Sequence, residues 1–300
     1  MVRDDGSSSD PGANAAENPE DVSQEAPSRP MDRDEQRRVS SVARGLLAGW
    51  EARADAPLVG TRKRKFQQQQ QQLALAHGLC AHVHYLAGPA LDLLDKGQVL
   101  ASLPLVRACF ESAVTAQWVT QTTDGAPAFV NEDVRQRRAQ VQTLEKAISQ
   151  VFREAAPEVA ANLVDPLETS ATAKGFHNLC NDLVPGGADA YSIYRMLSQY
   201  SHASVLVIDE YLQATHTGPG LALRTAPVEP NGATWTNVLA AALVWAGRAI
   251  DYLDKDHVRR SKLRAAAASL GITSELQFSP AAVLREAKSK KTKPKPPPAA

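Results

Sequence analysis

The sequence predicts an all-α protein, a single bundle of about seven helices between disordered N- and C-terminal tails. The chain is rich in Ala and Leu, and only 5% of its 300 residues are aromatic, a composition that favours helices over strands. Apolar residues recur at three- and four-residue spacing through long segments, and they do not alternate as they would in a strand. No internal repeat is visible, so we expect one core.

The two ends of the chain have compositions that do not favour a packed structure. Residues 1–30 carry seven acidic residues against Arg3 and Arg29, and we expect a disordered acidic tail there. Residues 288–300 are rich in Lys and Pro and are expected to stay extended. The expected domains are thus the tail 1–30, a helical bundle at 31–272, and a short helix with a basic tail at 273–300.

The first half of the chain predicts four long helices, of which the third is the most apolar. Because this third helix is apolar nearly all round, we expect it to be central and buried. The fourth is expected to follow a loop of sequence TDGAPAF and to start with an acidic turn. The first helix is expected at about residues 32–54, and the second from the end of the basic run 62–65 to about residue 94. The third is expected at about residues 98–122, and the fourth from Asn131 onward.

The second half predicts shorter helices separated by Pro and Gly. Pro157 should open a short helix, and Pro185-Gly186-Gly187 should break the chain before a helix that starts near Ala188. That helix is either continuous through Ser201-His202-Ala203-Ser204 or interrupted there, with this pair of serines capping a new helix. An irregular hairpin is expected within 216–233. After it, a long helix capped by Thr234 should continue through 257–270 and end at Gly271. A final turn of helix should start at Ser279-Pro280.

The three cysteines, Cys80, Cys109 and Cys180, have no disulfide or metal-site spacing and are expected to be small apolar fillers in a reducing compartment. His77 and His84 flank Cys80 at a spacing that suits metal ligands. Since no fourth ligand is evident, we expect both histidines to lie on a polar helix surface. The sequence therefore predicts no metal and no cofactor.

Two charged residues interrupt the apolar third helix. Arg107 and Glu111 are four residues apart and should share one face. One interpretation is an internal ion pair, in which case removal of Glu111 should cost more than about 2 kcal/mol because it strands a buried arginine. The other is that one of them faces a polar cleft.

The clearest candidate site is the segment 194–202, which reads YRMLSQYSH. Arg195 and His202 are seven residues apart, nearly two helical turns, so on a helix they would leave the same face roughly 10 Å apart along the axis. Tyr194 and Ser198 belong to the same segment, and Asp209 follows it. We therefore predict a polar cleft formed by these five residues with Arg107 and Glu111.

The segments LPLVRACFESAVTAQWV and YSIYRMLSQYSHAS resemble a bacterial family of unknown function that has a helical core like that of the HEPN superfamily. That family carries an Arg-x-x-x-Glu helix followed by a Tyr-Arg-x-Leu-Ser-x-x-x-His segment, and the resemblance covers about residues 75–255. In active HEPN domains this motif implies metal-independent RNA cleavage. His202 would then be the general acid or base and Arg195 would stabilise charge on the phosphate, at a site shared by two copies of the chain.

Three functions are consistent with these observations. The first is binding of RNA or a protein partner through the polar cleft in a defence or stress context, which is favoured because Met196 replaces a residue that is commonly polar in active HEPN domains. The second is a toxin-like endoribonuclease that uses Arg195 and His202. The third is a purely structural protein with a buried ion-pair network. The expected partners are RNA, a second copy or an antitoxin-like protein.

We also expect a cytoplasmic protein without a membrane segment. The best candidate span, residues 100–119, contains Pro104, Arg107 and Glu111, which do not suit a hydrocarbon environment.

Overall fold

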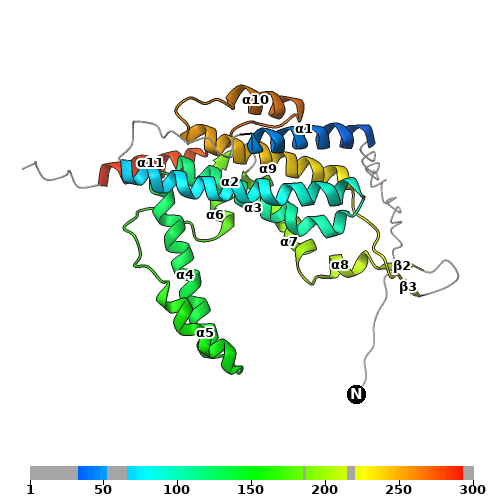
Figure 1. Ribbon diagram of the computed structural model, residues 1–300, viewed down its shortest axis with the longest axis horizontal. Coiled ribbons are helices and arrows are strands. Elements are labelled where there is room, and N and C mark those ends of the chain that lie inside the picture. Colours follow the sequence, from blue (N-terminus) through cyan, green and yellow to red (C-terminus); the bar gives the residue numbers. More distant parts are fainter. Residues whose placement is uncertain (1–32, 53–65, 185–186, 215–219, 293–300) are drawn as a thin grey trace, which may run out of the picture. The chain divides into compact units, whose positions relative to one another are not determined.

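The computed structural model describes residues 33–52, 66–184, 187–214 and 220–292, and it is all-α (Figure 1). Eleven helices and two small two-stranded sheets are present in these ranges. The fold class expected from the sequence is therefore confirmed. The predicted acidic tail 1–30 lies outside the described residues, as does the end of the basic tail.

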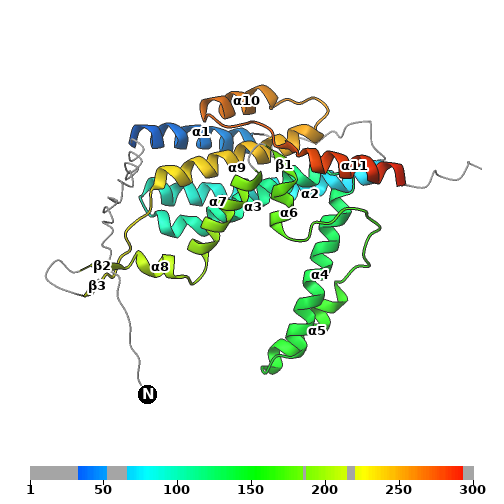
Figure 2. The ribbon, with the colours of Figure 1, turned by 180° about the vertical axis from the view of Figure 1, so that it is seen from behind.

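Three long helices form the centre of the bundle. They are α2 (Phe66–Asp95), α3 (Val99–Gln121) and α9 (Gly232–Leu253), and each packs against the other two. α1 (Arg33–Glu51) packs mainly on α9, and α7 (Gly187–Ser201) packs on α3 (Figure 2). The start of each central helix is close to the predicted boundary, because their apolar faces are long and continuous.

α3 is deeply buried in its C-terminal half, where every residue from Ala113 to Thr120 is buried. In the described part of the chain it is the one helix long and apolar enough to cross a membrane, but 61% of its apolar window is buried inside the bundle. Its apolar character is therefore accounted for by packing against α2, α7 and α9.

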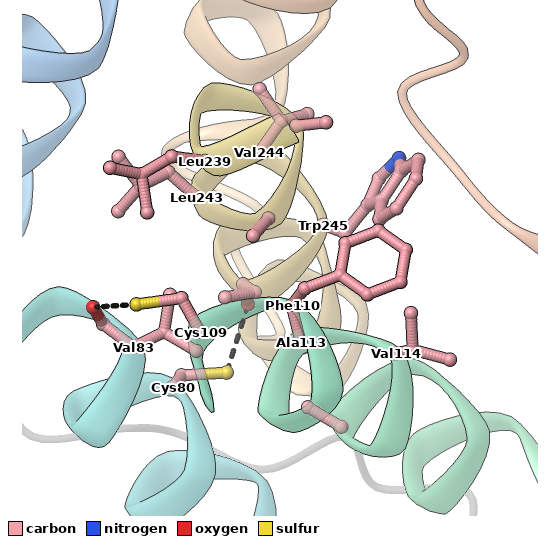
Figure 3. Close-up of a cluster of buried hydrophobic side chains, with 14 of the residues drawn as sticks. Cys80, Val83, Cys109, Phe110, Ala113, Val114, Leu239, Leu243, Val244 and Trp245 are labelled. Carbon is pink, nitrogen blue, oxygen red and sulfur yellow. Dashed lines mark hydrogen bonds between the residues drawn. The ribbon is translucent and has the colours of Figure 1, made fainter. Parts of the chain in front are cut away.

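The core between these helices is filled by aliphatic, aromatic and thiol side chains (Figure 3). The rings of Phe110 on α3 and Trp245 on α9 lie 5.9 Å apart. Cys80 and Cys109 are fully buried and donate weak hydrogen bonds to the carbonyl oxygens of Ala246 and Val83. Cys180 is also buried, so all three cysteines fill the core as predicted. Burial raises the pKa of the Cys109 thiol to about 12.

Two predicted boundaries in the middle of the chain are wrong. α4 (Gly125–Glu145) begins six residues before Asn131, because GAPA forms its buried first turn, where Pro127 needs no N–H partner. α5 (Gln150–Ala161) contains Pro157 instead of starting at it. α4 and α5 pack together as a helical pair beyond the end of α3 (Figure 1).

The C-terminal third also differs from the prediction. α9 is capped by Asn231, whose side chain accepts a hydrogen bond from the amide of Ala233 (3.1 Å), and not by Thr234. The helix does not continue through 257–270, because the chain turns at His257 (φ 50°). A separate helix, α10 (Arg260–Ser269), follows and ends before Gly271 (φ 66°), as expected for a glycine stop. α11 (Pro280–Thr292) continues past residue 288, where an extended tail was predicted.

The remaining elements are short. α6 (Phe176–Asn181) precedes β1 (Leu183–Val184), which pairs antiparallel with β4 (Gln277–Phe278). α8 (Val205–Asp209) precedes the hairpin of β2 (Leu212–Ala214) and β3 (Leu221–Leu223), close to the irregular hairpin predicted from the sequence.

Candidate functional site

The predicted arginine of α3 meets the YRMLSQYSH segment directly. One terminal nitrogen of Arg107, Nη1, lies 3.1 Å from Nε2 of His202, and the other, Nη2, donates to the hydroxyl of Tyr194 at 3.1 Å. The guanidinium also lies over the Tyr194 ring, 5.1 Å from its centre, within range of a cation–π interaction. We call Arg107, Tyr194 and His202 the arginine cluster. It joins α3 to the end of α7.

His202 lies just beyond α7, which ends at Ser201. The Ser204 side chain caps the next helix by accepting a hydrogen bond from the amide of Val207 (3.3 Å), and it donates to the carbonyl of Gln199 (2.7 Å). Of the two alternatives considered from the sequence, the structure has the helix break with a serine cap. His202 is therefore held on an exposed connection and not on a helical face.

The geometry of the arginine cluster fixes the tautomer of His202. Because arginine only donates hydrogen bonds, Nε2 of His202 must accept and the proton of the neutral ring must be on Nδ1. The lone pair that a general base needs is therefore engaged by Arg107 in this arrangement. Nε of Arg107 is buried and has no hydrogen-bond partner within the described residues.

Glu111 interacts with the arginine cluster more weakly than predicted. Its carboxylate is 4.0 Å from Nη2 of Arg107, and its side chain is 41% exposed. Burial of the remainder raises the pKa of Glu111, and the charge of Arg107 partly offsets that rise. An ion pair this exposed contributes about 0–1 kcal/mol. The expectation of a sealed ion pair is therefore wrong, and an exposed pair gives no reason to expect a loss above about 2 kcal/mol on removal of Glu111.

A row of aromatic rings that was not predicted from the sequence continues from the arginine cluster. The Tyr194 ring is 4.5 Å from that of Phe176 and 6.1 Å from that of Tyr191, and His177 packs edge-on against Tyr191 at 4.6 Å. All four rings are partly or fully exposed. The spacing of Tyr191 and Tyr194 by three residues on one helix was a signal that they share a face. Nothing local in the sequence connects them to Phe176 and His177 of α6.

The other predicted site residues are not brought into the cluster. Arg195 is exposed, and no hydrogen bond or ion pair connects it to another described residue. It faces solvent because successive helical residues are about 100° apart and its neighbour Tyr194 faces α3. Ser198 donates to the carbonyl of Tyr194 (2.8 Å), which is a local bond within α7. Asp209 is exposed at the end of α8.

The histidines considered as metal ligands have different surroundings. His77 is exposed, but His84 is buried, which contradicts the prediction of a polar surface. The ring of His84 stacks on Trp50 of α1 at 4.3 Å, and its Nδ1 bonds the carbonyl of Cys80 at 2.7 Å. No group of three or more His, Cys, Asp or Glu side chains in the described ranges is placed to hold a metal ion.

Comparison with known proteins shows which part of the chain resembles a family, but it assigns no activity to the protein. Residues 73–219 match a family of unknown function, DUF5677. The match includes both segments on which the resemblance was based, and therefore the whole arginine cluster. No match was found among curated proteins or among solved structures.

Proposed function

We propose that this protein binds single-stranded RNA at the arginine cluster and the adjoining aromatic row. The observation that carries the proposal is the placement of a half-buried arginine, Arg107, directly against Tyr194 and its aromatic neighbours. Single-stranded RNA is recognised by the same combination, in which arginines contact phosphates and aromatic rings stack on unpaired bases. The HEPN-like resemblance of the two segments supports the same substrate class.

Arg195 supplies a second cation for a phosphate group. It is exposed and unpaired with any other described residue, so RNA binding would not have to break an existing ion pair. Arginine suits this role because its planar fork can make two hydrogen bonds to one phosphate. The Nδ1–H of His202 is a further donor at the surface.

The geometry supports binding more than cleavage. A general base needs a free lone pair, and in His202 the Nε2 lone pair is directed at Arg107. Arg195 and His202 are not joined by any contact in the described structure, and Met196 between them is 50% exposed. Cleavage by these residues would require a rearrangement or a contribution from a second copy.

Fluorescence anisotropy with a labelled 12-nucleotide single-stranded RNA tests the proposal. Arg195→Ala and His202→Ala should weaken binding about tenfold each, which corresponds to about 1.4 kcal/mol. Arg195→Ala should also reduce the dependence of affinity on salt, because one phosphate contact is lost. The matched control is Arg138→Ala on α4, since Arg138 is also exposed and without a described partner, and it should change affinity less than twofold.

Two results would overturn the proposal. One is that the wild-type protein does not bind the RNA at low salt, and the other is that Arg138→Ala weakens binding as much as Arg195→Ala. The same samples should be run on a denaturing gel. Intact RNA is expected, whereas cleavage by the wild type that His202→Ala abolishes would establish the endoribonuclease alternative.

A further inference from the structure

A small cavity, partly open to solvent, lies on the other side of α7 from its solvent face. Its volume is about 200 Å³. Ala190 and Ile193 of α7 line it together with Val114 of α3, Trp245 of α9, Leu183 of β1 and Leu276, the residue before β4. Figure 3 shows Val114 and Trp245 at the edge of the core, where they contribute to this wall.

The polar atoms near the cavity are already bonded or lie at its rim. The indole N–H of Trp245 donates to the carbonyl of Thr273 (3.0 Å), and the Thr273 hydroxyl donates to the carbonyl of Glu275 (2.9 Å). Asp189 is exposed. None of the buried side-chain atoms found without a hydrogen-bond partner in the described ranges belongs to a residue that lines the cavity.

The thiol of Cys180 in the wall is also effectively apolar. Burial, reinforced by the nearby charge of Glu111, raises its pKa to about 12. The thiol is therefore neutral near pH 7 and behaves as a small apolar group.

We propose that this cavity binds a compact, uncharged apolar molecule of about the size of a single six-membered ring. Water in the cavity finds few polar partners, because the walls offer almost none. Apolar cavities of about 150 Å³ admit benzene or xenon, so a cavity of about 200 Å³ has room for a substituted ring or a short branched hydrocarbon chain. Displacement of water from apolar walls favours an apolar occupant.

The ligand would act on α7 because that helix supplies part of the wall. Ala190 and Ile193 face the cavity, and Tyr194, the residue after Ile193, belongs to the arginine cluster. A bound ligand would thus stabilise the helix that carries the candidate site. The apolar character of the cavity does not depend on RNA binding.

Thermal unfolding of the full chain with toluene tests the proposal. Toluene should raise the wild-type Tm by about 3 °C at ten times its Kd. Pyrimidine, a ring of similar size with two polar nitrogens, should raise it by less than about 1 °C. Ala190→Leu should fill the cavity and abolish the toluene shift. The control Ala139→Leu, the same change at an exposed position of α4, should keep it.

A ¹²⁹Xe NMR titration of the wild type gives a readout that does not depend on a variant folding. A concentration-dependent shift of the xenon signal beyond that of a denatured control is expected. The proposal is overturned if the wild type shows neither this shift nor a Tm increase with toluene. It is overturned equally if Ala190→Leu retains the full toluene effect or if pyrimidine binds as well as toluene.

Discussion

Arg248 is a charged residue in the interior of the bundle. Its side chain is 3% exposed, and it forms ion pairs with Asp251 on the same helix, which is fully buried, and with Glu275 beyond α10. Arg260 adds a longer contact to Asp251 at 3.5 Å. This network connects α9 to α10 and to the segment before β4.

Replacement of Arg248 by Met should lower the free energy of unfolding by about 3–5 kcal/mol, because it leaves the carboxylate of Asp251 buried without its main partner. Urea denaturation measures this. The control is Arg137→Met, which removes an exposed pair with Asp133 and should cost about 0.5 kcal/mol or less. Equal losses in the two variants would show that the Arg248 network is not buried in solution.

The burial of His84 should make the stability of the protein depend on pH. Burial lowers the pKa of His84 to about 4 in the folded protein, whereas an unfolded histidine has a pKa of about 6.5. Between these values the unfolded chain binds more protons, so stability is complete above about pH 6.5 and falls as the pH falls toward 4. The loss due to this residue should reach about 2 kcal/mol at pH 5.

The variant His84→Phe isolates this effect because it keeps a ring against Trp50 and removes the titrating group. It should be less stable than wild type at pH 7, since it loses the bond to the Cys80 carbonyl. Its free energy of unfolding should change about 2 kcal/mol less than that of the wild type between pH 7 and pH 5. Parallel pH profiles for the two proteins would contradict the assigned burial of His84.

At the scale of elements, the start of α7 depends on a glycine. A Cβ on Gly187 would lie 2.1 Å from the carbonyl oxygen of Cys180, so α7 and α6 pack too closely for any side chain there. Gly187→Ala should therefore lower the free energy of unfolding by about 1–3 kcal/mol through overpacking.

Gly78 within α2 is the matched control, since a Cβ there meets nothing within 4 Å. Gly78→Ala should raise stability by about 0.5–1 kcal/mol, because alanine is the better helix former. Denaturation of both variants under one condition gives the comparison. A stabilising Gly187→Ala would mean that α6 and α7 are not in the contact described.

At the scale of the whole molecule, the sequence was sufficient for the class of fold and for the central place of α3. Both follow from apolar periodicity, which is a local property. The burial of His84 was missed because it depends on Trp50, a residue of another helix that covers it. The break after α9 was missed because His257 adopts a positive φ while its ring bonds the carbonyl of Asp251 (2.6 Å), and such a turn has no sequence signal of its own.

The candidate site, too, could be predicted from the sequence only in part. One alternative from the sequence was that Arg107 or Glu111 faces the same cleft as Arg195 and His202, and the structure has Nη1 of Arg107 3.1 Å from Nε2 of His202. The separation of Arg195 from that pair and the addition of Phe176 and His177 depend on how α7 rotates against α3 and α6. Tertiary packing sets that rotation, so spacing along one helix could not reveal it.

Ultraviolet crosslinking of bound single-stranded RNA, followed by mass spectrometry of the crosslinked peptides, tests the central claim most directly. Stacked aromatic rings crosslink to bases, so the account predicts crosslinks at Phe176, Tyr191 and Tyr194, with a marked loss in Arg195→Ala and little change in Arg138→Ala. Crosslinks confined to α4, α5 or α10, with none in α6 or α7, would contradict it.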